Sequence, residues 1–342
     1  MPVRHGPVTC QPLSEWIAEV SEMRVSVIGA GAIGGWLTAG FVKGGAEATV
    51  LARGSTLDAL RKGALTLETA DGTERIPVKA TDDPADLQNA NVLLLGVKAH
   101  DLPALAPVIA RIMTPETRVM PAVNGLPFWF FADFGGPARG MTLEAVDPGG
   151  ALAGLMPAGN VVANVVHAAS RVPAPGHIQL VKADRVWLGG AAPGLDEIAK
   201  CLVAGGVPAR VTADIHREVW AKLWGNSNMN PISALARADC AQILDDAGVR
   251  SLITAMMREM AQLGERIGLS GFDDIEGRLA VTRRLGAFRT SMLQDVEAGR
   301  AIELGPILGS LVELAARLGH PVPVMTGVHG LARLLDQNLR TG

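Results

Sequence analysis

The sequence predicts an α/β domain built on a parallel sheet, followed by an all-α domain. From residue 23 to about residue 120, short strand-like apolar runs alternate with helical segments, which is typical of a parallel sheet with helices on both faces. From Asp214 to Leu339 the apolar residues recur at helical spacing, and strand-like runs are few. A chain of 342 residues is long enough for two such domains.

The first domain is expected to span residues 23–213. Its predicted elements follow in the order strand 25–28, helix 32–43, strand 48–51, helix 57–62, strand 91–97, helix 104–112 and strand 118–122. Residues 65–68 and 75–78 form a predicted hairpin around Asp71-Gly72, because Asp-Gly favours tight turns. The stretch 139–210 is rich in Gly and Pro, and we expect strands in it near 161–167 and 177–188.

The second domain, residues 214–342, is expected to be helical, with a boundary near 210–214. Long helices are predicted at 214–229, 247–267, 272–285 and 306–318. The last of them ends at Gly319-His320-Pro321, because glycine and proline stop helices.

Residues 1–22 stand apart from both domains. They contain three prolines and no long apolar stretch, and Met23 directly precedes the first predicted strand. We interpret them as a non-native or disordered extension. The alternative is a short helix over 13–21 that packs on the surface.

Composition excludes several classes of function. The formal net charge of −3 lacks the positive potential that nucleic-acid binding needs. Apolar runs such as 92–97 are too short to span a bilayer, so no membrane is expected as a partner. Three cysteines without metal-ligand spacing argue against a disulfide framework and favour a reducing cytoplasm. The absence of tyrosine rules out the Tyr-dependent mechanism of short-chain reductases.

A glycine motif follows the first predicted strand and opens the first helix; its residues are Gly29, Ala30, Gly31, Ala32, Ile33 and Gly34. Gly29 permits a tight turn, Gly31 lets the backbone approach a pyrophosphate, and Gly34 lets helix and strand pack closely. The phosphate then lies at the positive end of the helix. The motif predicts a Rossmann-type domain that binds a dinucleotide, and a glycine turn that binds nothing is the alternative.

The end of the second predicted strand indicates which dinucleotide is bound. An acidic side chain there would bind the ribose hydroxyls of NAD, but this chain has no acid and carries Arg53. A guanidinium suits the 2′-phosphate of NADP(H), which favours NADP(H) as cofactor. The alternative is an ordinary surface arginine.

Two more polar residues follow predicted strands at the edge where such sheets bind ligands. Lys98 comes after the strand 91–97, in a place suited to a cofactor phosphate or ribose. Asn124 follows the strand 118–122 in the same way. The alternatives are a solvated loop lysine and a simple turn at Asn124-Gly125, since Asn-Gly favours turns.

The helix predicted from residue 214 carries a polar stripe: Lys222, Asn226 and Asn230 stand four residues apart and so share one face. Asparagine is a poor helix former, so we favour the lining of a wet cavity over a solvated face. Pro231 disfavours helix at Asn230. An ammonium beside two amides suits an anionic substrate with a carbonyl, because Lys222 can protonate the oxygen and the amides can orient the rest.

A second cluster contains Ser291, Gln294, Asp295 and Glu303. Ser291 and Gln294 have the spacing of a capping box, which is the alternative to a ligand contact. Glu303 stands among apolar residues and is placed to pair with Lys222. No histidine lies in a comparable constellation.

Together these residues resemble the ketopantoate reductase (2-dehydropantoate 2-reductase) family. The likeness runs from Met23 to about Pro323. It rests on an ordered set of motifs, namely Gly29–Gly34, Arg53, Val97-Lys98-Ala99, Asn124-Gly125, Lys222-Leu-x-x-Asn226-x-x-x-Asn230-Pro231, Ser291-Met-Leu-Gln-Asp295 and Glu303.

The resemblance implies NADPH-dependent reduction of a 2-oxo acid, ketopantoate to pantoate, in pantothenate biosynthesis. Ketopantoate would bind in the cleft between the Rossmann-type domain and a helical domain that closes over it. Lys222 would be the general acid, and Asn226, Asn230 and Ser291 would hold the substrate. A homodimer is a possible assembly.

The resemblance also assigns cofactor contacts. Asn124 would touch both nicotinamide and substrate, while Glu303 and the backbone near Ala169 would help to place the cofactor.

Three residues depart from the family pattern. Gly305 and Leu308 stand where the family often has Asp and Asn, and Cys240 stands where some members carry a substrate-contacting Asn. We therefore expect intact chemistry with an altered substrate pocket, in a divergent branch of the family.

Two other functions fit parts of the sequence. Enzymes of the 6-phosphogluconate and β-hydroxyacid dehydrogenase group also place Lys and Asn four residues apart on a helix, but Asn230 and the pair Ser291 and Glu303 argue against that group. A non-enzymatic NADP(H)-sensing module is disfavoured because it would have no need of Lys222.

Overall fold

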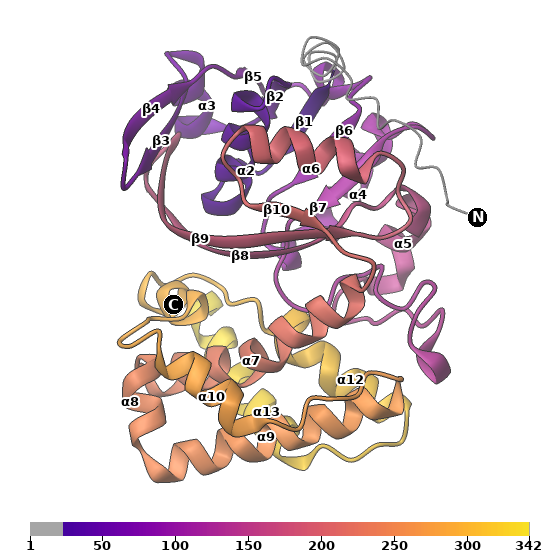
Figure 1. Cartoon of the computed structure of the whole chain (residues 1–342), viewed down its shortest axis with the longest axis vertical. Helices are drawn as coiled ribbons and strands as arrows, with labels where there is room; N and C mark the ends of the chain where they lie inside the picture. Colours follow the sequence, from indigo (N-terminus) through magenta and orange to yellow (C-terminus); the bar gives the residue numbers. More distant parts are fainter. Residues whose placement is uncertain (1–22, 342) are drawn as a thin grey trace, which may run out of the picture.

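The structure, a computed structural model, describes residues 23–341, and the predicted extension 1–22 lies outside them. Figure 1 shows an α/β domain above a helical domain, with the long helix α7 (Ile215–Ala236) at their junction. The predicted fold class is confirmed, because a parallel sheet with helices precedes a helical domain.

Five parallel strands form the first sheet: β1 (Arg24–Ile28), β2 (Glu47–Leu51), β5 (Lys79–Thr81), β6 (Val92–Leu95) and β7 (Arg118–Pro121). Their spatial order is β5-β2-β1-β6-β7. Every residue of β6 is buried, as expected for a central strand covered on both faces. The order reverses between β1 and β6, so the carboxyl ends of these two strands form the crevice where such sheets bind ligands.

The helices of this domain are α2 (Ala32–Lys43), α3 (Gly54–Arg61), α4 (Ala106–Ile112), α5 (Ala151–Leu155) and α6 (Leu195–Ala204). Short 3₁₀ turns lie at Pro84–Leu87, Ala99–Asp101, Pro103–Leu105, Gly136–Ala138, Pro148–Gly150 and Ala158–Asn160. The predicted helix 104–112 therefore starts as a 3₁₀ turn. Helix α6 was not predicted, because it lies within the Gly- and Pro-rich stretch 139–210.

A second sheet contains β3 (Leu65–Thr69), β4 (Gly72–Ile76), β8 (Ala163–Ala174), β9 (His177–Gly189) and β10 (Ala209–Val211). The predicted hairpin around Asp71-Gly72 is confirmed as the antiparallel pair β3–β4. The two strands expected between 161 and 188 form one long antiparallel hairpin, β8–β9. In Figure 1 this hairpin runs along the side of the α/β domain that faces α7.

The helical domain consists of α7, α8 (Cys240–Asp245), α9 (Ala247–Arg266), α10 (Ile275–Arg283), α11 (Ser291–Glu297), a π-helical turn (Gly305–Gly309), α12 (Ser310–Arg317) and α13 (Pro323–Thr341). The predicted helices 247–267, 272–285 and 306–318 correspond to α9, α10 and the π turn with α12. The prediction that Pro231 ends the first helix was wrong, because α7 continues through it to Ala236. Burial of α7 outweighs the one backbone hydrogen bond that proline removes.

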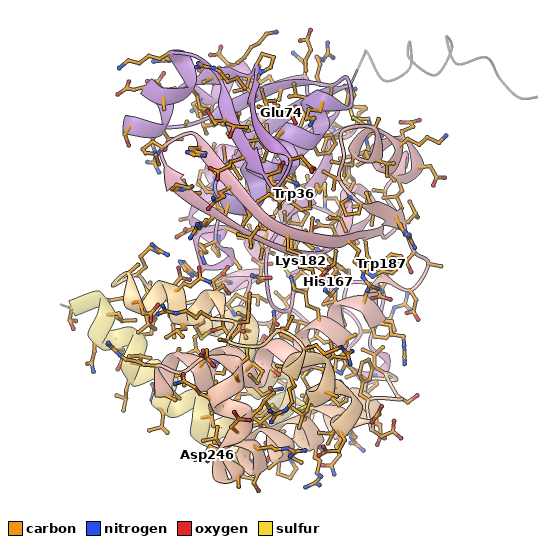
Figure 2. The ribbon with its side chains drawn as sticks, turned by 60° about the vertical axis from the view of Figure 1, so that its left-hand side comes forward. Trp36, Glu74, His167, Lys182, Trp187 and Asp246 are labelled. Atoms are coloured by element: carbon orange, nitrogen blue, oxygen red, sulfur yellow. The ribbon has the colours of Figure 1, made fainter. Side chains whose placement is uncertain are left out.

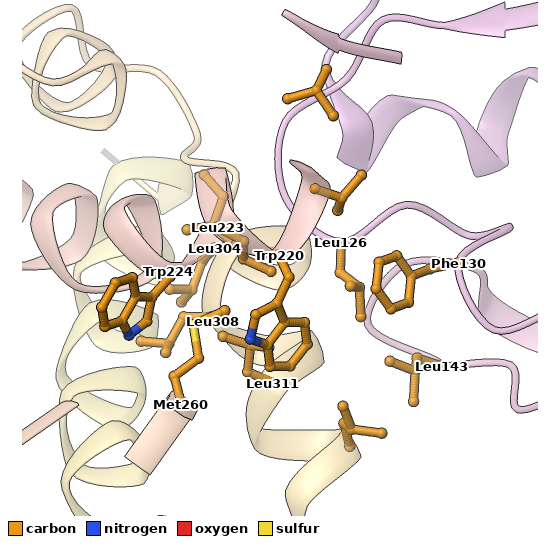
Figure 3. Packing of buried hydrophobic residues seen from close by; sticks show 14 of the residues in the cluster. Leu126, Phe130, Leu143, Trp220, Leu223, Trp224, Met260, Leu304, Leu308 and Leu311 are labelled. Atoms are coloured by element: carbon orange, nitrogen blue, oxygen red, sulfur yellow. The ribbon is translucent and has the colours of Figure 1, made fainter. Parts of the chain in front are cut away.

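The two domains share a continuous apolar core. Buried residues of the α/β domain, among them Leu126 and Phe130, belong to the same cluster as the buried residues of α7. Figure 3 shows Phe130 and Leu126 facing Trp220, and the ring centroids of Phe130 and Trp220 lie 6.2 Å apart. This shared core fixes the α7 side chains relative to the carboxyl edge of the sheet. Between residues 23 and 341, no helix is both long and apolar enough to cross a bilayer.

Candidate active site between the domains

The glycine loop joins β1 to α2, and its glycines have different physical roles. Gly29 has φ +93°, and a Cβ added to Gly34 would lie 2.0 Å from the carbonyl oxygen of Gly29. The packing of the protein itself therefore requires these two glycines. A Cβ added to Gly31 would meet nothing closer than the Gly96 oxygen at 3.9 Å.

The space in front of Gly31 is open because of its missing side chain. It lies at the N-terminus of α2, which has no side-chain cap, so the backbone amides of the first turn remain available to an anion. The rest of the loop, Ala30, Ala32 and Ile33, is half-buried. These features fit a dinucleotide pyrophosphate.

Arg53 lies two residues beyond β2, where it is the exposed N-cap residue of α3. Because Leu51 of β2 pairs with Ile28 of β1, the strand ends before Arg53 and before the glycine loop are neighbours. No hydrogen bond or ion pair among residues 23–341 engages its guanidinium. Its position fits the predicted contact with a 2′-phosphate.

Lys222 extends from α7 to the α/β domain. Its Nζ donates hydrogen bonds to Asn124 Oδ1 at 2.7 Å and to the Val166 carbonyl oxygen at 2.8 Å. Asn124 follows β7, and Val166 lies in β8, so three segments of the chain hold the ammonium. A lysine ammonium has three donors, and the third remains for a ligand.

Burial shifts the proton affinity of the groups around this ammonium. It lowers the pKa of Lys222 from its usual 10.5 to about 8, and the negative charge of Glu303 opposes that shift. Burial and the positive charge of Lys222 lower the pKa of His167 to about 4. Figure 2 shows His167 between the two domains. At neutral pH the site therefore contains a protonated lysine of weakened basicity and a neutral histidine.

Two amides of α7 accompany Lys222. Asn226 is half-buried and Asn230 is buried, and neither side chain hydrogen-bonds to another residue in the described part of the chain. Neither contains a fully buried unpartnered atom, so both amides are accessible to a ligand. Asn226 and Lys222 belong to a small pocket formed by both domains, whose lining residues are Pro121, Val123, Gly125, Pro127, Asn164, Val165, Val219, Lys222, Leu223 and Asn226.

Ser291 is the first residue of α11, and the capping-box interpretation of it was wrong. The N-cap is Thr290, whose hydroxyl accepts from the Leu293 amide at 3.2 Å. The half-buried Ser291 hydroxyl thus takes no part in the cap. It remains a candidate ligand contact.

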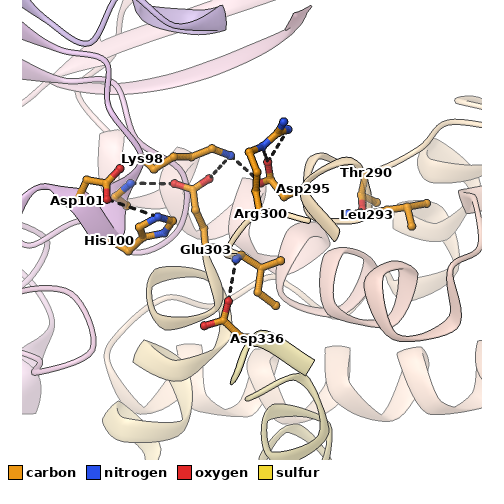
Figure 4. Close-up of polar contacts among 11 residues, drawn as sticks. Lys98, His100, Asp101, Thr290, Leu293, Asp295, Arg300, Glu303 and Asp336 are labelled. Atoms are coloured by element: carbon orange, nitrogen blue, oxygen red, sulfur yellow. Dashed lines mark hydrogen bonds and ion pairs between the residues drawn. The ribbon is translucent and has the colours of Figure 1, made fainter. Parts of the chain in front are cut away.

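The predicted pairing of Glu303 with Lys222 is not what the structure shows. Glu303 instead accepts from Lys98 Nζ at 3.3 Å and from the Ala99 amide at 2.9 Å. Asp295 accepts from the same Nζ at 2.8 Å and from Arg300 Nε at 3.0 Å (Figure 4). Lys98 thus joins the edge of the sheet to the helical domain.

This ion-pair cluster also sets the charge of Lys98. Burial disfavours the ammonium, but Glu303 and Asp295 outweigh it, so the pKa of Lys98 lies above its usual value. The carboxylates are almost fully buried, whereas 41% of the Lys98 side chain is exposed. A cofactor could still reach this partly exposed ammonium.

The three departures from the expected pattern have separate places. Gly305 and Leu308 lie in the π-helical turn, where a Cβ on Gly305 would come within 2.7 Å of the Ala145 oxygen and Leu308 is fully buried. Both therefore serve packing. Cys240 is the buried first residue of α8, and burial raises its thiol pKa to about 11. Ala169 lies half-buried in β8, two residues after His167.

Several groups at this site have no recognisable sequence signal. The Val166 carbonyl, His167 and Arg278 gave no motif, because only folding brings them to α7. Asn164 lines the pocket with an unpartnered buried Oδ1. No group of three or more His, Cys, Asp or Glu residues suited to a metal ion occurs within residues 23–341.

Comparison with known proteins identifies relatives over nearly the whole described chain. Residues 25–128 match the family model "Ketopantoate reductase PanE/ApbA", and residues 214–336 match "Ketopantoate reductase PanE/ApbA C terminal". A 2-dehydropantoate 2-reductase from Mesorhizobium japonicum is 37% identical over 92% of this chain and 98% of its own length.

Two solved structures share the fold. A crystal structure from Ralstonia solanacearum is 40% identical, with a TM-score of 0.87 over 92% of this chain and 98% of its own. The 2-dehydropantoate 2-reductase from Geobacter metallireducens is 25% identical, with a TM-score of 0.79 over 91% of this chain and 99% of its own.

Proposed function

The chain belongs to the ketopantoate reductase family, and we propose that it uses NADPH to reduce ketopantoate to pantoate, with Lys222 as the general acid. The family makes it an oxidoreductase that acts on CH–OH groups and supports reduction of a 2-oxo acid. The observation that carries the proposal is the ammonium of Lys222, held between the domains by Asn124 and Val166.

The geometry suits proton donation to a carbonyl oxygen. Asn124 and Val166 engage two donors of Lys222 and fix its direction, so the third N–H is available to the substrate oxygen. The lowered pKa brings the ammonium closer to the acidity that efficient proton transfer requires. NADPH, when bound, supplies the hydride. Asn226, Asn230 and Ser291 then provide polar groups that hold the acid in place.

The residues at the sheet edge support NADPH as the cofactor, which the family uses. The open space before Gly31 and the uncapped N-terminus of α2 suit the pyrophosphate. Arg53 suits the 2′-phosphate, and Lys98 is placed to meet phosphate or ribose.

The preference for NADPH is expected to depend on Arg53. Arg53→Ala should lower kcat/KM for NADPH by about 10- to 100-fold, the effect of losing a hydrogen bond to a charged group, and leave kcat/KM for NADH nearly unchanged. Arg61→Ala is a suitable control, because Arg61 lies on the same helix and pairs at the surface with Asp82. A wild-type enzyme that prefers NADH, or an unchanged cofactor ratio in the variant, would overturn the assignment.

The substrate assignment is tested by NADPH oxidation with a panel of 2-oxo acids. We expect ketopantoate to be reduced, with discrimination of only about 10²-fold against its analogue without the terminal hydroxyl. A site built to bond that hydroxyl reaches about 10⁴- to 10⁵-fold, but here the poor hydrogen-bonding residue Cys240 stands where some relatives have Asn.

The expected discrimination is checked by measuring kcat/KM for ketopantoate and for its analogue without the terminal hydroxyl. A ratio above about 10⁴ would mean that other residues hydrogen-bond to the substrate hydroxyl and that Cys240 does not limit the discrimination. No turnover of any 2-oxo acid in the panel would reject the proposed function, and activity on 3-hydroxy acids instead would favour the β-hydroxyacid dehydrogenase group.

A further inference from the structure

An arginine of α10 lies against the helix that carries the proposed general acid. A Cβ added to Gly225 of α7 would lie 1.7 Å from Nη2 of Arg278 and 2.6 Å from its Cζ. Gly225 therefore leaves the space that the guanidinium occupies. Because Gly225 stands between Lys222 and Asn226, the guanidinium lies beside the polar face of α7.

This guanidinium has no counter-charge among residues 23–341. Its one protein hydrogen bond runs from Nη1 to the Thr282 hydroxyl at 2.9 Å. By contrast, Arg283 on the same helix pairs with Asp245 at 2.6 Å, and Arg250 pairs with Glu276. Arg278 is half-buried, and a partly desolvated cation without an anion is unfavourable for folding.

The unused donors of Arg278 remain accessible. None of its nitrogens is a fully buried atom without a partner, and a guanidinium has five N–H donors in a planar fork. Such a fork matches the two oxygens of a carboxylate. The accessible donors thus suit a bound anion.

The charge of Arg278 also reaches one residue of β8 and one residue of α8. This positive charge helps to lower the pKa of His167 in β8, as the charge of Lys222 also does. The same charge opposes the rise in the pKa of the Cys240 thiol that burial causes. Lys222 and Arg278 therefore both influence His167, and Arg278 also influences Cys240, one of the residues that depart from the family pattern.

We propose that Arg278 binds a carboxylate of the oxo-acid substrate. The inference rests on the proposed function and adds a specificity-determining residue to it. A 2-oxo acid carries one carboxylate beside the reacting carbonyl, and a dicarboxylic 2-oxo acid carries a second at its far end; the chemistry of recognition is the same for both. An incoming carboxylate provides the counter-charge that the protein lacks.

The central experiment compares Arg278→Gln with Arg283→Gln, an exposed arginine on the same helix. Arg278→Gln should raise KM for the oxo acid by about 10- to 100-fold, as for a lost charged hydrogen bond, with kcat within about threefold and KM for NADPH unchanged. Arg278→Lys should recover part of the loss because it restores the charge without the fork. Tm should not fall in Arg278→Gln, because no protein ion pair is lost; a large fall with unchanged KM would indicate a structural role and overturn the proposal.

Gly225→Ala provides an independent variant, because it keeps the charge and displaces it. The added methyl should push the guanidinium away and raise KM in the same direction. In a double-mutant cycle the two changes should not add, since they disrupt one interaction. Full additivity of the two effects would contradict the proposal.

Two substrates distinguish the source of the carboxylate. If Arg278→Gln raises KM for both ketopantoate and 2-oxoglutarate, Arg278 binds the carboxylate next to the carbonyl. If the substitution raises KM only for 2-oxoglutarate, Arg278 binds the distal carboxylate. Either result supports an anion site, whereas KM within twofold of wild type for both acids overturns it.

A binding measurement distinguishes failure of the proposed function from failure of the Arg278 proposal. If the wild type reduces neither acid, the anion site is still tested by equilibrium binding of oxalate. The Kd is compared between the NADP⁺-loaded wild type and the NADP⁺-loaded Arg278→Gln variant. Weaker binding in the variant supports the anion site, and equal binding rejects it.

Discussion

Lys222→Ala is expected to lower kcat by about 10²- to 10⁴-fold, the contribution of a positioned general acid, while NADPH still binds. The ammonium hydrogen-bonds to Asn124 and Val166 and to no residue of the glycine loop, so its loss removes proton donation and leaves the pyrophosphate site intact. The assay is NADPH oxidation at saturating ketopantoate, combined with a fluorescence titration of NADPH.

Lys182→Ala serves as the control, because Lys182 is a surface lysine of β9 that pairs with Asp184. It should retain wild-type kcat. A loss of less than tenfold in Lys222→Ala, measured where the chemical step limits the rate, would remove Lys222 from the role of acid.

The pH profile tests the same assignment without a substitution. Burial lowers the pKa of Lys222 to about 8, and a general acid acts only when protonated. kcat/KM in the reductive direction should therefore be flat at neutral pH and fall as pH rises above about 8. An unchanged rate between pH 7 and pH 10 would contradict this assignment.

Gly31→Val is expected to raise the Kd for NADPH by about 10²-fold or more, because the side chain would fill the space in front of the first turn of α2 and displace an anion from more than one backbone amide. The fold should persist. The added Cβ meets nothing closer than 3.9 Å, and the backbone at Gly31, with φ −75° and ψ −162°, lies in the extended region that valine adopts readily. The measurements are a fluorescence titration of NADPH and Tm.

Gly34→Ala is the matched variant with the opposite behaviour. Its Cβ would lie 2.0 Å from the Gly29 carbonyl oxygen, so it should lower stability by about 1–3 kcal/mol or more through overpacking, seen as a lower Tm. If Gly31→Val bound NADPH as tightly as the wild type, the pyrophosphate could not lie where the loop geometry suggests.

Local sequence signals predicted the parts of the site that one segment forms by itself. The glycine loop needs only a strand, a turn and a helix, and its residues are consecutive. Lys222, Asn226 and Asn230 share a face because the helix repeat places them there. The same reasoning failed at Pro231, which burial keeps inside α7. The capping-box alternative at Ser291 also failed, because the preceding residue, Thr290, is the N-cap.

Partners of charged groups could not be predicted, because they join distant segments. Glu303 was expected to pair with Lys222, but it binds Lys98, 205 residues away in sequence. Lys98 and Lys222 are chemically equivalent as ion-pair partners for a carboxylate. The docking of the two domains through the shared core decides which one lies within reach.

Hydrophobic periodicity and glycine spacing are local properties of the chain, and they were enough to predict the fold class, the dinucleotide loop and the place of Lys222 on the polar face of a helix. The partners and the proton affinity of that lysine follow instead from contacts between distant segments. The long β8–β9 hairpin brings the Val166 carbonyl to its ammonium, and burial between the domains lowers its pKa. The same packing leaves Arg278 beside it without a counter-charge. Burial and the distance between charges arise only when remote segments pack together, and for this reason no sequence pattern encodes them directly.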